Sequence, residues 1–250
     1  TLQVWMGLTA GCAKCHDHKY DPITMKEYYS LYAFLNQTAD SDKFTDIPVM
    51  PAPTQEQTEE VDRLKEKIKA FERVLEALDE VPESDEDLDA PIKEAIEGIR
   101  ADIAAVPIPI IPVMEELPGD KRRTTHIMER GNFLSLGEEV HPEVPAHFHA
   151  FPEGAPADRA GLSEWLMDDA NPLTARVAVN RHWAQLFGTG IVETQEDFGS
   201  QGMPPTHPKL LDWLAVEFAE SGWSFKQLCK TIVMSSTYRQ AAITTPAKLE

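Results

Sequence analysis

The residues best suited to chemistry lie near the start of the chain, where two cysteines and a histidine occur as Cys12-Ala13-Lys14-Cys15-His16. Two thiols separated by two residues can each bond one vinyl group of a haem, and a histidine that follows directly can ligate the iron. The spacing therefore predicts covalent attachment of haem c through Cys12 and Cys15, with His16 as an axial ligand.

Two other uses of the same residues stay open from the sequence. Zinc favours mixed sulfur and nitrogen coordination, and four candidate ligands lie together: Cys12, Cys15, His16 and His18. Structural zinc sites usually take their second pair of ligands from well downstream, so this set is crowded for a tetrahedron. A thiol redox pair or a disulfide staple is the third use, although thioredoxin-like pairs do not carry an adjacent histidine.

A second axial ligand for a haem iron must come from elsewhere in the chain, and Met or His usually supplies it. Four side chains have the required chemistry: Met6, Met25, Met50 and His126. Met25 lies one turn into the helix expected after the motif, and His126 lies in an irregular region that can fold back. We therefore expect Met25 or His126 to be the second ligand, with His18 as an accessory one.

A further group of polar residues lies in the C-terminal half. Arg176 and Asn180 are four apart and share one face of a helix, and Asp197 and His207 offer acid and base groups. The same residues fit a structural network tied to the acidic segment 193–197. No nucleophile motif accompanies them, so a hydrolase or oxidase site is the weaker interpretation and the sequence makes no claim of enzyme activity.

Three histidines in a predicted loop form a last candidate, a small metal-binding cluster of His141, His147 and His149. The remaining cysteine, Cys229, lies among apolar residues at helical spacing and is expected to be a buried, inert thiol.

The net charge restricts the partners. With 42 acidic and 23 basic residues the chain carries a formal charge of -19, and such a field repels phosphate backbones and anionic lipid surfaces. Nucleic acid is therefore excluded as a partner. No stretch approaches the roughly 18 apolar residues of a membrane span, because prolines interrupt the most apolar run, residues 104–114.

The elements expected to position these residues are mainly helical. Asp21-Pro22 signals the start of a helix that runs to Leu35, with a buried stripe of Ile23, Tyr28, Leu31, Tyr32 and Leu35. Pro48, Pro51 and Pro53 predict an extended linker. Apolar residues every three or four positions in 54–105 predict an antiparallel, coiled-coil-like helical hairpin, with an acidic turn at 80–87.

The second half alternates irregular and helical segments. Residues 106–150 are predicted to be extended and poor in β-structure, with one β-like piece at 125–128. Helices are predicted at Arg159–Met167, Thr174–Phe187, Pro208–Glu220 and Ser224–Tyr238, with Gly188 and Gly222 as C-terminal stops. The fold class is mainly α: an irregular helical domain with an inserted hairpin, divided into residues 1–53, 54–105 and 106–250.

Several stretches resemble one family. The segment from Gly7 to Ile23 is similar to the end of the planctomycete cytochrome-like domain. Later motifs resemble the planctomycete-specific domain that follows it in large secreted proteins: Thr125-His126, Arg130 to Phe133, Gly137 to Val140, Asn171 to Arg181, Thr194 to Gly199 and His207 to Leu214. Leu136 departs from the family pattern, which has a proline before the glycine.

The resemblance implies an extracytoplasmic location, periplasmic or secreted, with the signal peptide outside this segment. It also implies other domains of the same full-length chain as partners, and a redox protein as a further partner, but it names no reaction. The leading hypothesis is a c-type haem protein for electron transfer or redox chemistry. The alternative is a non-redox binding or structural module of a secreted polysaccharide-handling system, with the cysteine motif used as a metal or disulfide staple.

Overall fold

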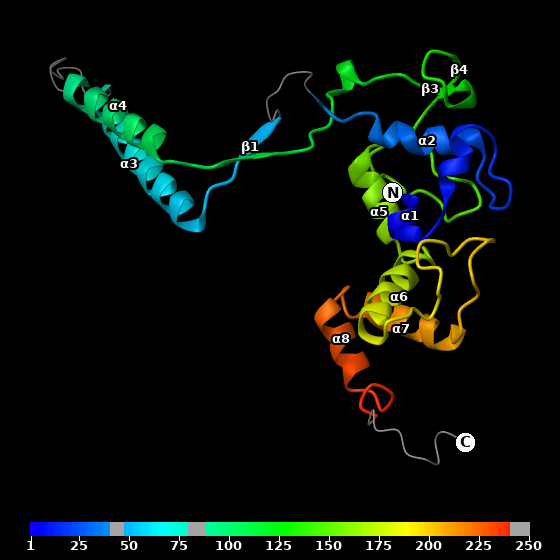
Figure 1. The fold of residues 1–250 in the computed structure, drawn as a ribbon. Coiled ribbons are helices and arrows are strands. Elements are labelled where there is room, and N and C mark those ends of the chain that lie inside the picture. Colours follow the sequence, from blue (N-terminus) through cyan, green and yellow to red (C-terminus); the bar gives the residue numbers. More distant parts are fainter. Residues whose placement is uncertain (41–47, 80–88, 241–250) are drawn as a thin grey trace. The chain divides into compact units, whose positions relative to one another are not determined.

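The computed structural model describes residues 1–40, 48–79 and 89–240 of the chain (Figure 1). The α-helices in these ranges are α1 (Leu2–Met6), α2 (Met25–Leu35), α3 (Gln55–Asp79), α4 (Asp89–Ala105), α5 (Arg159–Met167), α6 (Thr174–Phe187), α7 (Pro208–Glu220) and α8 (Phe225–Val233). Two small antiparallel sheets accompany them, β1 (Val49–Pro51) with β2 (Ile110–Pro112) and β3 (Thr125–Met128) with β4 (Leu136–Val140). The predicted mainly α fold is confirmed. None of the described helices is long and apolar enough to cross a membrane.

The chain divides into two compact units, one of residues 1–37 with residues from 117 onward, and one of residues 38–116. The sequence placed boundaries after residues 53 and 105 instead. The difference arises because the proline-rich segment is not a bare linker: Val49 pairs with Pro112 and Thr38 with Glu116. These pairings extend the hairpin unit to residues 38 and 116.

The unit of residues 38–116 is built on the predicted hairpin of α3 and α4. Leu64 and Ile96 are its buried side chains among the described residues. The charged faces carry exposed ion pairs at helical spacing, such as Glu60 with Arg63 at 2.7 Å, which contribute little stability because water screens them. The acidic turn predicted at 80–87 lies outside the described residues.

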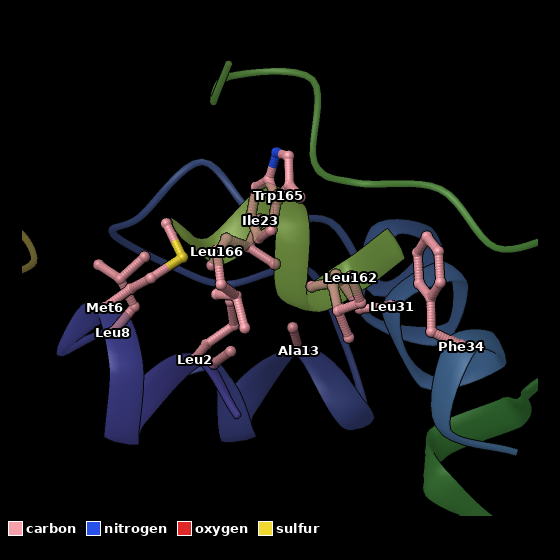
Figure 2. Packing of buried hydrophobic residues seen from close by; sticks show 11 residues of the cluster. Leu2, Met6, Leu8, Ala13, Ile23, Leu31, Phe34, Leu162, Trp165 and Leu166 are labelled. Carbon is pink, nitrogen blue, oxygen red and sulfur yellow. The ribbon is translucent and has the colours of Figure 1, made fainter. Parts of the chain in front are cut away.

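The larger unit packs the cysteine motif onto a core shared by distant segments (Figure 2). Leu2, Met6 and Ala13 come from the start of the chain, and they meet Leu162 and Trp165 of α5. Two residues lie between the cysteines, and one of them, Ala13, is fully buried. Burial of this alanine fixes which face of the motif points into the core and which points outward.

Helix α2 begins at Met25, three residues later than predicted, because Thr24 and not Asp21 caps it. The Thr24 side chain accepts a hydrogen bond from the Glu27 N–H while the Glu27 carboxylate accepts from the Thr24 N–H, a reciprocal pair that satisfies two free donors. Burial alone would raise the pKa of Glu27, but the N–H groups of Thr24 and Ala146 outweigh it and hold that pKa below its ordinary value.

The buried face of α2 also differs from the prediction. Leu35 is exposed, whereas Tyr29 and Phe34 are buried. The helix has apolar neighbours on two sides: Leu31 and Phe34 join the core with α5, and Tyr29 packs against β3 and β4. A prediction based on one apolar face fails for a helix that packs against two separate clusters of buried residues.

Helices α6, α7 and α8 enclose a second core that includes Val179, Leu214 and Ile232. The predicted bounds of α5, α6 and α7 are confirmed, and Gly188 ends α6 in the left-handed conformation expected of a stop residue. The prediction for α8 began one residue early, at the N-cap Ser224, and ended five residues late, because the polar run after Met234 favours turns over helix. Cys229 is half-buried and not buried as predicted.

Candidate functional site

The cysteine motif lies on a short 3₁₀ helix, η1 (Ala10–Lys14). The Cys15 N–H donates to the Cys12 carbonyl at 3.2 Å, and residues three apart in a 3₁₀ helix lie one above the other on the same face. Cys12 and Cys15 are both exposed and both free of any disulfide. The two thiols therefore form one accessible pair, opposite the buried Ala13.

A cavity of about 530 Å³ opens beside Cys12, which forms part of its wall, whereas Cys15 does not line it. Its apolar lining comes from Leu2 and Leu8 near the start of the chain, Leu31 of α2 and Leu162 of α5. Ligand sites in proteins are typically clefts of about 300–1,000 Å³ with mainly apolar walls and few polar groups. The cavity therefore has the size and the lining of a binding site for a large apolar group held at Cys12.

Tyr28 is a half-buried tyrosine of this cavity. Its side chain is part of the wall, and burial raises the pKa of Tyr28, with smaller contributions from Tyr32 and from Cys15. Tyr28 and Cys12 thus belong to the wall of the same cavity.

The adjacent Tyr29 holds the motif in place. Its hydroxyl lies 2.9 Å from the Lys14 carbonyl and 3.3 Å from the Met128 carbonyl. Burial raises the pKa of Tyr29, and the charges of Tyr28 and Cys15 raise this pKa further by smaller amounts. Because Lys14 ends η1, this contact fixes the turn against β3.

His16 is exposed, and its Nδ1 lies 2.7 Å from the Asp17 carbonyl oxygen. A carbonyl oxygen only accepts, so Nδ1 carries the hydrogen and Nε2 keeps its lone pair in the neutral ring. Metal-ligating histidines commonly donate their other ring N–H in this way. The tautomer of His16 therefore suits a metal ligand, but of the three motif residues only Cys12 lines the cavity.

His18 has a different environment. Its ring is buried, and Nδ1 accepts a hydrogen bond from the Asp21 N–H at 2.8 Å, which leaves the proton on Nε2. His18 thus stabilises the loop after the motif. Among the residues that the structure describes, no group of three or more His, Cys, Asp or Glu side chains is placed to hold a metal ion, so the four zinc candidates do not converge.

The candidates for a second iron ligand lie away from the cavity wall. Met6 is fully buried in the core, and Met25 packs beside the core of Tyr29 and β3. His126 lies on β3 with Nδ1 at 3.1 Å from the Gly137 carbonyl. Met50 belongs to the other unit, in β1. None of the four lines the cavity.

The downstream polar residues have separate partners in the structure. Arg176 pairs with Asp212 at 2.8 Å, Asn180 binds Val192, Asp197 accepts from the Gly199 N–H at 2.9 Å, and His207 contacts Thr206 at 3.0 Å. No hydrogen bond or ion pair between described residues joins any two of the four. Arg181 pairs with Glu196 at 3.4 Å, in line with a structural network.

The predicted histidine cluster does not form either. His149 stacks on Trp165 with ring centroids 4.8 Å apart, and its Nε2 donates to the Trp165 carbonyl at 2.8 Å. Trp165 in turn donates its indole N–H to the His149 carbonyl at 3.0 Å. His149 therefore secures the loop to α5, and among the described residues it does not converge with His141 and His147 into a metal-type group.

Sequence reasoning missed Asp21 as a contact between distant segments. Its carboxylate is buried and accepts the Ser200 N–H at 2.7 Å. Nearby, the Phe198 N–H donates to the Gly7 carbonyl at 2.7 Å, and Arg181 donates to the Gln3 carbonyl at 3.1 Å. These bonds join the motif segment to the C-terminal helices, and local pattern gives no signal for them.

Two family models match the chain. Residues 158–250 match PSD1, described as a protein of unknown function (DUF1553), and residues 1–40 match PSCyt2, described as a protein of unknown function (DUF1549). Both matches agree with the planctomycete-type resemblance, and neither description states an activity. No curated protein and no solved structure matches the chain. The two matched segments are the ones that the bonds of Asp21, Phe198 and Arg181 hold together.

Proposed function

We propose that this chain carries a covalent c-type haem on Cys12 and Cys15, with His16 as an axial ligand, and acts as a redox component of an extracytoplasmic protein. The observation that supports this most is the pair of free, exposed thiols, one of which, Cys12, lines a cavity of about 530 Å³ with a largely apolar wall.

The residues of the chain have distinct parts in this function. The two cysteines anchor the ring through thioether bonds, and His16 offers its Nε2 lone pair. Leu2, Leu31 and the rest of the apolar wall keep water from the ring, and solvent access together with burial tunes the potential of such a centre. When bound, the haem supplies one-electron chemistry.

The proposal extends to location and partners. Covalent haem attachment takes place outside the cytoplasm, so the mature protein is periplasmic or secreted. The electron partner is another domain of the same full-length chain or a separate redox protein. With a formal charge of -19, the chain favours a partner that presents a basic surface.

Pyridine haemochrome spectra test the attachment directly. The chain is exported to the periplasm of a host that matures c-type cytochromes, purified, and extracted with acidified acetone. We expect the haem to stay with the polypeptide. Cys12→Ala combined with Cys15→Ala should abolish retention, and Cys229→Ala, the matched control outside the motif, should retain haem as the unaltered chain does.

Two results would count against the proposal. One is protein that carries no covalent haem under these conditions. The other is stoichiometric zinc by elemental analysis together with unmodified thiols at Cys12 and Cys15, which would favour a non-redox module in which the motif is a metal staple.

A further inference from the structure

The two thiols of the motif have different surroundings. Cys12 lines the cavity, whereas Cys15 lies against the turn of residues 129–132 that follows β3. A Cβ atom added at Gly131 would lie 3.0 Å from the Cys15 sulfur and 3.5 Å from Lys14 Cε. The first separation is shorter than ordinary contact between non-bonded atoms, so glycine is the residue that lets this turn approach the second cysteine so closely.

The backbone of the turn is strained. Arg130 and Gly131 both have positive φ, 52° and 73°, and the Asn132 N–H donates to the Glu129 carbonyl at 3.0 Å. The left-handed conformation is unfavourable for arginine, and the exposed Arg130 side chain forms no hydrogen bond or ion pair within the described residues that would favour it. Strain of this kind persists where the surroundings impose it, and it is common at functional sites.

A buried side chain from a third element holds the turn at the motif. The Tyr29 hydroxyl of α2 lies 2.9 Å from the carbonyl of Lys14, the residue before Cys15, and 3.3 Å from the carbonyl of Met128, the last residue of β3. The start of the turn and the end of η1 are therefore fixed to the same group. The approach of Gly131 to the Cys15 sulfur is thus built into the fold.

On the basis of the proposed haem attachment, we infer that Gly131 is a positioning residue for the second thioether: it leaves open the side of the Cys15 sulfur on which that bond forms. The Cys15 sulfur bonds to one carbon of a vinyl group and the thiol hydrogen goes to the other, so the step needs no oxidant and releases no leaving group. A methyl group at residue 131 competes with the sulfur for space. Cys12 keeps its surroundings, because it lies in the cavity wall.

Alkylation of the reduced full chain, produced without haem, tests the contact itself. Gly131→Ala should slow the reaction of Cys15 with N-ethylmaleimide about fivefold, as expected when a side chain is forced off its rotamer, and should leave Cys12 unaltered. Trypsin cleaves after Lys14 and so places the two cysteines in separate peptides for mass spectrometry. Gly154→Ala is the matched control, since Gly154 also has positive φ but nothing lies within 4 Å of the added Cβ. It should change neither rate.

The haem-matured chain tests the thioether. Gly131→Ala should carry haem on Cys12 alone, with Cys15 still open to alkylation. The vinyl group that stays unreacted should move the pyridine haemochrome band to longer wavelength, a signature that a general loss of stability does not give. Gly154→Ala should form both thioethers.

A second variant tests the contact without relying on Gly131→Ala. In a chain that lacks Cys12 and Cys229, Gly131→Cys should form a disulfide with Cys15 under mild oxidation. The 3.0 Å between the Cβ position and the Cys15 sulfur suits an S–S bond of about 2.05 Å. Mass spectrometry detects the loss of two hydrogens.

The outcomes separate this inference from the proposed function. Two thioethers in Gly131→Ala, unaltered alkylation of Cys15, or no disulfide from Gly131→Cys would each overturn the role of Gly131 and leave haem attachment standing. An unaltered chain without covalent haem would overturn the proposed function and the thioether role with it, whereas slower alkylation of Cys15 would still show that Gly131 controls access to this thiol.

Discussion

The contact between Asp21 and Gly199 allows a sharp test of how the cysteine motif is held. The Asp21 side chain is 6% exposed, and its carboxylate accepts the Ser200 N–H at 2.7 Å. A Cβ atom on Gly199 would lie 2.6 Å from the Asp21 carboxylate, a separation that forces the carboxylate to move. Gly199→Ala therefore breaks the same hydrogen bond that Asp21→Ala removes.

The expected magnitudes follow from this shared bond. A hydrogen bond to a charged group contributes about 1.5–3 kcal/mol, so each single substitution should destabilise the larger unit by about 2 kcal/mol. In the Asp21→Ala background there is no carboxylate for the new methyl group to displace. The double variant should thus lose about 2 kcal/mol as well, instead of the roughly 4 kcal/mol expected of independent sites.

Urea denaturation, monitored by tryptophan fluorescence, reports the unfolding of the larger unit, because all five tryptophans lie outside residues 38–116. Gly119→Ala is the matched control, since nothing lies within 4 Å of the Cβ position that it would add, and it should stay within about 0.5 kcal/mol of the unaltered protein. Additive losses in the double variant would refute the shared-bond reasoning.

Three further outcomes follow from single groups. Because the folded pKa of Glu27 is lowered from 4.5, its stabilising effect is complete above that pH and is lost as pH falls through the folded value. Glu27→Gln should cost about 1 kcal/mol at pH 7 and progressively less as pH falls below 4.5, by urea midpoints. Asn180→Ala leaves both backbone groups of Val192 unpaired in the core and should cost about 2–4 kcal/mol in the same assay. Tyr28 and Tyr29 have raised pKa values, so stability should decline as pH rises above about 10, and ultraviolet titration should show both tyrosines ionising later than a free tyrosine.

The features that the sequence predicted well depend on neighbouring residues. Helix α5 follows Asp158, whose side chain accepts from the Ala160 and Gly161 N–H groups, and α6 ends at Gly188. Capping residues and C-terminal glycines of this kind lie within a few residues of the helix end that they determine, so the local sequence predicts them. The cysteine motif is equally local, which is why its chemistry could be proposed without a structure.

The cavity could not be predicted in that way. Its wall combines Leu2, Cys12, Leu31 and Leu162, which are distant in sequence and have ordinary helical or loop contexts. The same limit applies to Asp21, which was interpreted as a helix cap because of the proline that follows. In the structure Thr24 caps the helix, and the Asp21 carboxylate instead accepts a hydrogen bond from the Ser200 N–H.

The hairpin unit, finally, should be removable without loss of the proposed haem site. The Leu117 N–H donates to the Gln37 carbonyl at 2.7 Å, and the Gln37 side chain both donates to and accepts from the backbone of Arg123 at 2.8 Å. The two ends of the larger unit therefore lie side by side, and a linker of about four residues, as in a hairpin loop, can join them. Replacing residues 38–116 in this way should leave the urea midpoint by tryptophan fluorescence within about 1 kcal/mol and haem retention unaltered. Loss of cooperative unfolding would instead mean that the larger unit depends on the hairpin for its stability.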